Sequence, residues 1–207
     1  MSRIFDISRP MSPRLAGWPG DTPFSLGWTM KQSDGHSVNV GRLTLSVHTG
    51  AHTDAPYHYD SRAATIDQVP LDVYLGPARL IDARGSETID VDTFSEWDLS
   101  DTPRVLLRTD GWIDSKHFPE SIPVLAKDVP AYLRRRGVVL VGLDVPSVDH
   151  LDSKQLPIHN ALGNSGIHIL EGLDLREPPE GVYELIALPL NILAADGSPV
   201  RAVLREL

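Results

Sequence analysis

Three histidines and two aspartates lie within one stretch of the chain, residues 48–60. The whole chain has eight histidines in 207 residues, so a window of this length should hold roughly half a histidine by chance. Neutral imidazole and carboxylate groups are the ligands that hold zinc, manganese and similar ions in proteins. This stretch therefore predicts metal chemistry, and the rest of the chain must provide the ligands and the framework that it lacks.

The spacing within this stretch indicates how its side chains converge. His48 ends an alternating segment that we expect to form a strand, His52 comes four residues later, and Asp54 follows two residues after that. A four-residue step places two side chains on the same side if the backbone becomes helical after Gly50. A proline between Asp54 and His58 disfavours a continuous helix. We expect a tight turn, one helical turn and then an extended segment, with His48, His52 and Asp54 meeting at one point and His58 facing it.

Three ligands leave a divalent ion open to water or substrate, which is typical of catalytic metal sites. A second ion needs further ligands, and the best candidates lie far downstream, at His159 and Glu171. Glu171 follows an apolar pair and precedes a glycine, so we expect it at the end of a buried element, where a carboxylate usually requires a cation. The alternatives are a solvated loop with hydrogen-bonding histidines, an exposed helix histidine at position 159 and a surface ion pair at position 171.

Other polar residues receive structural interpretations. Asp144 and Asp149 flank a Pro-Ser pair at the end of a predicted strand, where they are expected to cap and turn the chain. His168 lies close to Glu171 and is a candidate for supporting the site from behind the ligands. Sequence alone assigns no chemistry to these residues.

Composition and charge exclude several classes of partner. The net charge is −9 and there is no basic run, which argues against nucleic acid and anionic membrane surfaces. Cysteine is absent, so any metal must be held by histidine, aspartate and glutamate. The start of the chain shows no signal-peptide pattern, and no window approaches the roughly 18–20 apolar residues of a membrane span. We expect a cytoplasmic protein whose residues 1–207 form a single domain.

Strand patterns outnumber helix patterns along the chain. Alternation predicts a strand over residues 38–47, with Leu43, Leu45 and Val47 on one face. A capping aspartate followed by a proline marks the start of a helix near residue 129. Further strands are expected over residues 4–8, 78–83, 104–109, 138–143, 183–190 and 200–204, and helices over residues 92–97, 129–136 and 154–162. The chain is thus predicted to be a β-rich α/β domain.

The histidine-rich stretch also resembles a known family signature. Its pattern of His48, Gly50, His52, Asp54, Pro56 and His58 is similar to the HxGxHxDxPxH motif of the metal-dependent cyclase-like hydrolases. Residues 18–23 (Trp-Pro-Gly-Asp-Thr-Pro), 145–149, 168–171, 183–190 and 196–203 resemble the bacterial kynurenine formamidase (arylformamidase) branch of that family. The similarity covers essentially the whole chain, with the same order and spacing.

This resemblance implies a fold, a reaction and an assembly. The family fold is a swivelling β/β/α domain, usually dimeric or larger, so a homodimer or higher homo-oligomer is expected. The reaction implied is hydrolysis of N-formyl-L-kynurenine to formate and L-kynurenine. A related cyclic-amide hydrolase, similar to isatin hydrolases, is the nearest alternative, because it shares the metal motif. A non-catalytic metal or small-ligand binding protein is the second.

The resemblance also implies roles for individual residues. Two divalent ions per subunit are expected, and zinc is the metal that the resemblance implies. The implied ligands are His48, His52 and Asp54 for the first ion, His159 for the second, and Asp54 and Glu171 as carboxylates that touch both. His58 matches the catalytic acid/base, and Trp18 matches an aromatic residue that contacts the substrate. Some relatives have a second histidine where this chain has Asn160, which could alter the rim of the pocket.

Overall fold

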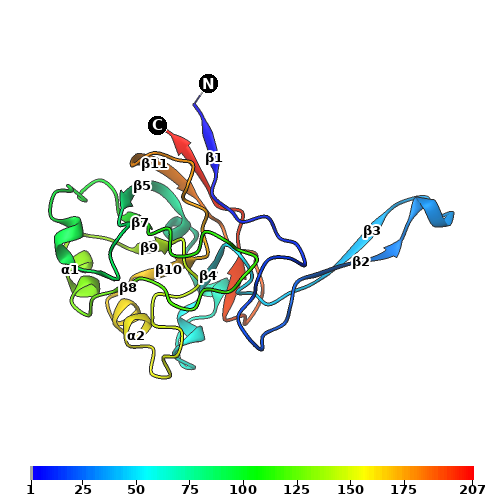
Figure 1. Cartoon of the computed structure of the whole chain (residues 1–207), viewed down its shortest axis with the longest axis horizontal. Coiled ribbons are helices and arrows are strands. Elements are labelled where there is room, and N and C mark those ends of the chain that lie inside the picture. The colour runs from blue at the N-terminus through cyan, green and yellow to red at the C-terminus, as the bar shows by residue number, and fades with distance from the viewer. Residues whose placement is uncertain (1) are drawn as a thin grey trace.

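A nine-stranded mixed sheet forms the centre of the molecule in this computed structural model, which describes residues 2–207 (Figure 1). In spatial order its strands are β1 (Ile4–Asp6), β13 (Val203–Glu206), β11 (Gly181–Ile186), β5 (Leu75–Asp82), β7 (Arg104–Arg108), β9 (Leu140–Leu143), β10 (His168–Glu171), β4 (His52–Asp54) and β12 (Gly197–Pro199). The chain termini meet at one edge, where β1 pairs with β13. The histidine-rich stretch contributes β4, near the opposite edge.

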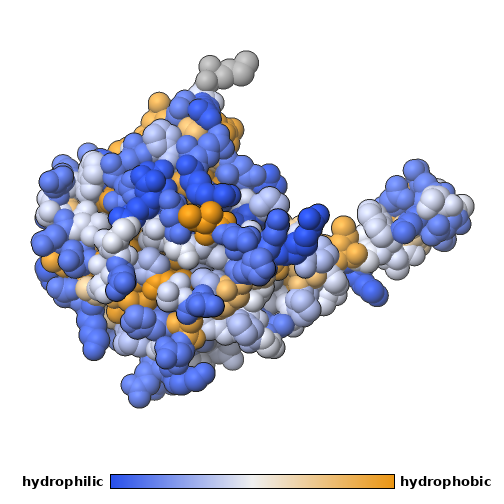
Figure 2. Space-filling view, viewed as in Figure 1, coloured by the Kyte–Doolittle hydropathy of each residue, from blue (hydrophilic) through white to orange (hydrophobic). Residues whose placement is uncertain are grey.

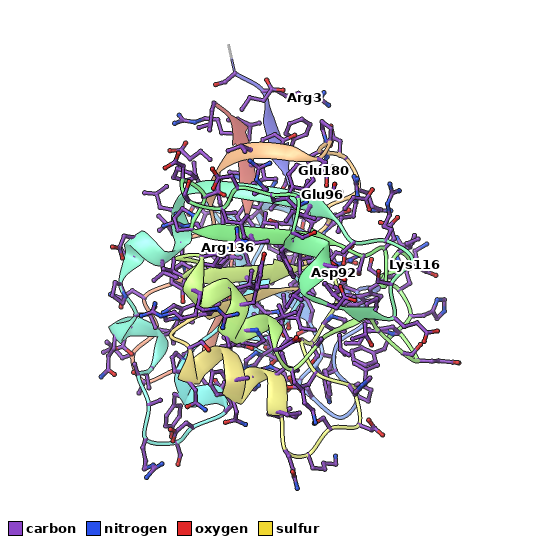
Figure 3. All side chains as sticks on the ribbon, turned by 90° about the vertical axis from the view of Figure 1, so that its left-hand side faces the viewer. Arg3, Asp92, Glu96, Lys116, Arg136 and Glu180 are labelled. Carbon is purple, nitrogen blue, oxygen red and sulfur yellow. The ribbon has the colours of Figure 1, made fainter. Side chains whose placement is uncertain are left out.

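The middle of the sheet is parallel and its flanks are antiparallel. Strands β5, β7, β9 and β10 pair in parallel, and all the other pairs of this sheet are antiparallel. Parallel neighbours require crossover connections, usually helical. Helix α1 (Val129–Arg135) precedes β9 and α2 (Pro157–Asn164) precedes β10. In the view turned by 90°, both helices lie in front of the sheet, with labelled charged side chains such as Lys116 and Glu180 around the outside (Figure 3). The helices therefore cover one face of the sheet.

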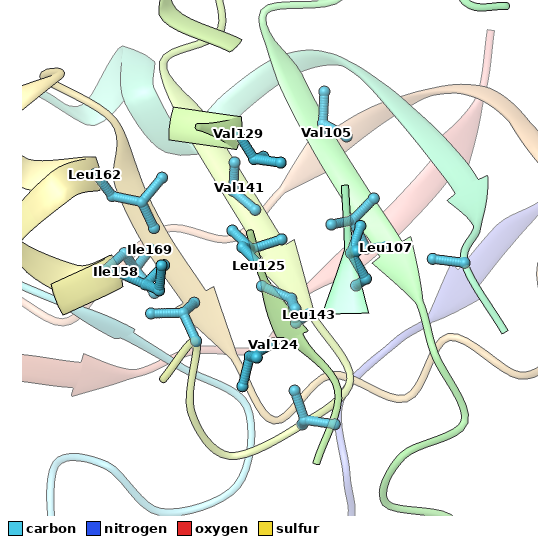
Figure 4. Close-up of a cluster of buried hydrophobic side chains, with 14 of the residues drawn as sticks. Val105, Leu107, Val124, Leu125, Val129, Val141, Leu143, Ile158, Leu162 and Ile169 are labelled. Atoms are coloured by element: carbon cyan, nitrogen blue, oxygen red, sulfur yellow. The ribbon is translucent and has the colours of Figure 1, made fainter. Parts of the chain in front are cut away.

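Two apolar layers pack on the two faces of this sheet. Side chains alternate along each strand, so neighbouring residues enter different layers. Val105 and Leu107 of β7 belong to the layer beneath the helices, and Leu106 belongs to the other. The helix-side layer also contains Val129 of α1, Ile158 and Leu162 of α2, and Val141, Leu143 and Ile169 of the sheet (Figure 4). This layer packs α2 against β10, and these two elements carry the candidate ligands His159 and Glu171.

Smaller elements surround this frame. A hairpin of β2 (Ser25–Met30) and β3 (Val40–Thr44) extends away from the body as an arm (Figure 1). Strands β6 (Thr88–Ile89) and β8 (Val124–Leu125) form a short parallel pair. The 3₁₀ helices are η1 (Gln32–Asp34), η2 (Pro56–His58), η3 (Ile66–Gln68), η4 (Leu71–Tyr74) and η5 (Val91–Phe94). Over residues 2–207, no helix is both long and apolar enough to cross a membrane.

The β-rich α/β prediction is confirmed, and most of the predicted elements appear with shifted ends. The helix predicted over residues 92–97 is wrong, because the segment forms only the 3₁₀ helix η5, capped by Asp90. The strand predicted over residues 38–47 is reduced to β3, whose residues are all exposed. Its alternation does not mark a core face, since the arm carries these residues away from the body.

The backbone path through residues 48–60 differs from the prediction. No strand reaches His48, which lies in a turn after β3. The chain becomes extended at His52–Asp54 and helical only afterwards, in η2. The physical reason is tertiary: β4 is hydrogen-bonded between β10 and β12, and Pro56 stands in the first turn of η2, where its missing N–H costs nothing. His52 and Asp54 share a face by the two-residue strand period and not by a helical step.

Candidate metal centre and active-site cavity

The pairing of β4 with β10 brings the first three acidic and imidazole groups together. In this antiparallel pair, His52 lies opposite Glu171 and Asp54 lies opposite Ile169. Directly opposed residues share a face, and Ile169 packs in the layer beneath the helices. The Nε2 atom of His52 is 3.4 Å from a Glu171 carboxylate oxygen and 3.6 Å from Asp54 Oδ1. Two carboxylates and an imidazole therefore converge below α2, and all three are buried.

Helix α2 adds His159 from above this face. Its Nε2 atom is 3.5 Å from Asp54 Oδ2 and 3.8 Å from Glu171 Oε1. Asp149 holds the other side of the ring, with Oδ2 2.7 Å from His159 Nδ1. The same carboxylate accepts the backbone N–H groups of Ile158 and His159, so it also caps the start of α2. One buried aspartate thus fixes both the helix and the direction of its histidine.

The turn before β4 and the segment before β12 complete the cluster. His48 Nδ1 lies 3.0 Å from Asp54 Oδ1, and His48 Nε2 lies 3.0 Å from Asp196 Oδ2. The same Asp196 oxygen lies 3.3 Å from Nδ1 of His58. The His48 and His58 rings are 4.2 Å apart between centroids. Asp196, a residue far along the chain, therefore links two histidines of the stretch.

A close backbone approach keeps these segments in place. Gly172 directly follows Glu171 and has φ +65°, a region that favours glycine. A side-chain carbon at this position would lie 2.1 Å from the carbonyl oxygen of Gly50, which itself has φ +68°. That carbonyl also lies 2.9 Å from Nδ1 of His52, which directs the opposite ring nitrogen toward Glu171. The two glycines thus let the β10 end and the β4 turn meet beside the ligands.

The donor set fits divalent metal ions. Asp54 Oδ2 and Glu171 Oε1 are buried and have no hydrogen-bond partner within the described residues. Buried carboxylate oxygens without donors are costly unless a cation balances them. Potential ligand atoms of His52, Asp54 and Glu171 all lie within 4.8 Å of one another, and so do those of His48, Asp54 and His58. Asp54 belongs to both groups, and its nitrogen and oxygen neighbours suit zinc or manganese.

The pKa values of the cluster residues also show that the carboxylates favour positive charge nearby. Burial by itself lowers the pKa of His48 and of His159, because it disfavours the charged ring. Hydrogen bonds to Asp54 and Asp196 outweigh burial and raise the pKa of His48 to about 9. Asp149 and Asp54 likewise raise the pKa of His159 to about 10. Burial raises the pKa of Asp54, but the nearby imidazoles of His159 and His48 hold it well below its usual value.

A cavity of about 520 Å³ opens onto this cluster. Its aromatic wall consists of Trp18, Trp112 and Phe118, with Trp18 edge-on to Phe118 at 5.2 Å between ring centroids. Its closed end is formed by cluster residues, namely His48, His52, His58, His159 and Glu171, of which His52, His159 and Glu171 are buried. The remaining lining comes from loops: Ala16, Gly17, Pro19, Gly20, Asp21, Gly50, Pro146, Ser147 and Leu156. An aryl group fits the wall and a small polar group fits the closed end.

The structure brings all six polar candidates from the sequence into one cluster. His48, His52, Asp54, His58, His159 and Glu171 meet there, and Trp18 lies on the cavity wall. Asn160 points elsewhere, because its amide donates to the carbonyls of Gln155 and Leu156 at the start of α2. His168 is three residues from Glu171 on the same strand, so it faces the opposite side.

Sequence reasoning missed Asp149 and Asp196 as members of the site. Asp149 does cap the chain as predicted, but it also contacts His159. Asp196 begins one of the segments that carry the family resemblance, which is the one signal that could have found it. Neither has a local pattern that points to the cluster, because each reaches it through tertiary contacts.

The fold and the cluster together define a metal-dependent hydrolase. The sequence profile of the family described as "Putative cyclase" matches residues 5–150. The chain is 47% identical to a kynurenine formamidase of Bacillus cereus and 45% identical to one of Bacillus cytotoxicus, covering 100% of this chain and 99% of each relative. This chain belongs to the cyclase family of hydrolases.

Solved structures agree with this assignment and confirm the predicted cyclase-like fold. A structure described as a potential metal-dependent hydrolase with cyclase activity superposes with a TM-score of 0.83 at 27% identity, covering 100% of this chain and 99% of the other. The isatin hydrolase A of Ralstonia solanacearum superposes with a TM-score of 0.83 at 22% identity, covering 100% and 92%. At that identity the second comparison establishes a shared fold only.

Replacing Asp149 tests its role as the support of His159. Asp149→Asn keeps an acceptor for the α2 backbone but removes the charge that orients the imidazole, so zinc affinity should fall about 10–100-fold. The measurement is competition for zinc against a calibrated chelator, with thermal melting to confirm folding. Asp152→Asn, an exposed aspartate in the same loop, is the control. Unchanged zinc affinity in Asp149→Asn would rule out this support.

Proposed function

We propose that this chain is a single catalytic domain that hydrolyses N-formyl-L-kynurenine to formate and L-kynurenine. The observation that carries the proposal is the aromatic-walled cavity that ends at the buried carboxylate–histidine cluster. The substrate is an aryl amide whose formyl group is small and polar, so its two ends match the two ends of the cavity. The names of the full-length relatives support this particular substrate.

The metal roles are also part of this proposal. We assign His48, His52 and Asp54 to one ion and His159 to a second, with Asp54 and Glu171 between them, and we propose zinc for both. The orphaned oxygens of Asp54 and Glu171 support a shared position between two cations. When bound, divalent cations polarise the formyl carbonyl and lower the pKa of a water molecule toward neutrality. Asp149 keeps His159 directed at this position.

His58 is the proposed proton carrier. The leaving group is an aromatic amine, which must receive a proton as the C–N bond breaks. His58 lines the cavity, and its Nδ1 faces Asp196, which leaves the other ring nitrogen for the substrate. A carboxylate behind an imidazole fixes the ring orientation and its tautomer. His58 also lies within ligand distance of His48 and Asp54, so its role needs a direct test.

Trp18 is the proposed partner of the substrate ring. Its indole is partly exposed on the cavity wall and contacts Phe118, which in turn contacts Trp112. Aromatic rings favour offset or edge-on packing, so the three side chains form a surface on which an aryl group can stack. The aryl ring held there places its amide substituent toward the cluster.

The assay that tests the function compares two substrates before and after chelation. Purified protein should hydrolyse N-formyl-L-kynurenine, lose that activity after dialysis against a chelator and regain it with added zinc. Isatin, assayed in parallel, should turn over much more slowly. Faster turnover of isatin would replace the proposed function with the cyclic-amide alternative, and full activity in protein verified free of metal would exclude the metal roles.

Two alanine variants separate proton transfer from metal binding. His58→Ala should keep its zinc and lose about 10²–10⁴-fold in kcat, the range for one general acid or base. Asp54→Ala should lose zinc and activity together, because its carboxylate faces both proposed ions. Elemental analysis and kcat are measured on both, with Asp60→Ala as the control from the same stretch. A zinc-free His58→Ala protein would move His58 into the ligand set.

We propose that the chain forms a homodimer through the β2–β3 arm. An isolated two-stranded hairpin is marginally stable in water, so a projecting one needs a partner surface. Apolar side chains lie exposed along it, notably Leu43 at 59% and Trp28 at 52%, and hydrophobic atoms are visible on the arm (Figure 2). A second copy of this chain is the occupant that the family resemblance supports.

A charge on the arm should break this dimer. Trp28→Lys places an ammonium group in the proposed interface, where large aromatic residues usually contribute most to affinity. Sedimentation should give a dimer for the wild type and a monomer for the variant. Leu193→Lys, at an exposed apolar position away from the arm, should remain dimeric. A monomeric wild type would refute the assembly.

A further inference from the structure

A rigid turn presents two different groups to the cavity. The backbone N–H of Asp21 donates to the carbonyl oxygen of Trp18 at 3.0 Å. Pro19 stands at the second position of this turn, and Gly20 at the third has φ +89°, as a type II turn requires. Such a turn keeps its first and last Cα atoms within about 7 Å. The Trp18 indole and the Asp21 carboxylate therefore line the cavity at a separation that the backbone sets.

The Asp21 carboxylate is available for a ligand. One of its oxygens accepts the backbone N–H of Thr22 at 2.6 Å. None of the ion pairs found among residues 2–207 involves Asp21. None of the residues that line the cavity is lysine or arginine. The open end of the cavity thus carries a negative charge that no lining side chain neutralises.

The two acidic residues of the lining have opposite environments. Glu171 is only 3% exposed and faces the imidazoles of the cluster, whereas Asp21 is exposed at the cavity mouth. Cations held by the cluster would repel a positive group of the substrate from the closed end. A positive group on a bound ligand is therefore directed outward, toward Asp21.

We propose that Asp21 determines specificity by binding the α-ammonium group of the amino acid side chain of the substrate. This inference rests on the proposed function, in which the aryl ring stacks on Trp18. The ring of N-formyl-L-kynurenine is joined to its α-carbon by a short acyl chain, so the ring and the ammonium group lie close enough together to contact two side chains of one turn. Asp21 thereby distinguishes a ring that carries an amino acid from an otherwise similar aryl amide.

This contact acts on binding and not on the chemical step. The ammonium group lies outside the bond that breaks, so its interaction is equally strong in the ground state and the transition state. Losing such an interaction raises KM and leaves kcat unchanged. A hydrogen bond to a charged group typically contributes about 1.5–3 kcal/mol, which corresponds to roughly tenfold or more in kcat/KM.

The test pairs one variant with two substrates. Asp21→Asn keeps the acceptor for Thr22 and removes only the charge. The substrates are N-formyl-L-kynurenine and its deamino analogue, 4-(2-formamidophenyl)-4-oxobutanoate, which has hydrogen in place of the ammonium group. We expect kcat/KM for the first to fall about tenfold through KM, and that for the second not to fall. Asp101→Asn, which removes the same charge at an exposed position outside the cavity, should change neither.

The outcomes separate this inference from the proposed function. Equal losses on both substrates, or no loss on either, would overturn the role of Asp21 while the proposed function stands. Wild-type protein that fails to hydrolyse N-formyl-L-kynurenine would overturn the function itself. In that case calorimetry decides the role of Asp21: a preference of zinc-loaded wild type for L-kynurenine over its deamino analogue, lost in Asp21→Asn, supports it, and no preference refutes it.

Discussion

The burial of two carboxylates on one face of the sheet is the constraint on which the rest of this structure depends. The register of β4 against β10 puts Asp54 and Glu171 on one face of the sheet, below a helix and out of water. Like charges in such a place are strongly unfavourable unless cations or protonated imidazoles balance them. The four nearby histidines can supply this positive charge, and the same requirement supports the proposed metal centre.

The fold satisfies this constraint by packing three segments together, namely β10, α2 and the turn before β4. The parallel strands fix where β10 ends, and the apolar layer shared by Ile158, Leu162 and Ile169 sets α2 over that end. Asp149 then aims His159 from the start of the helix. The two glycines at positions 50 and 172 allow the backbones to approach closely enough for the turn histidines to reach the carboxylates. Packing and backbone contacts beside the ligand residues thus determine the geometry of the cluster.

Local sequence patterns predict the long elements of this fold better than its short strands and its arm. The long periodic segments were predictable because burial on a sheet or under a helix leaves a repeating apolar pattern. The core face predicted over residues 38–47 is wrong because β3 alternates like a core strand, although all its residues are exposed. Strands β4 and β12 are each three residues long and have no apolar alternation, so no local pattern marks them, whereas the apolar pair before Glu171 did indicate the buried strand β10. They exist because their neighbours in the sheet pair with them.

The sequence by itself determined the kind of chemistry. The density of histidine and aspartate in residues 48–60, the absence of cysteine and the isolated Glu171 after an apolar pair restrict the site to nitrogen and oxygen ligands. Only the tertiary structure decided which residues meet. His159, Glu171 and Asp196 join the stretch from more than a hundred residues away, through strand register and helix docking. Local preferences do not encode such contacts, because they arise from the summed burial of side chains across the whole sheet.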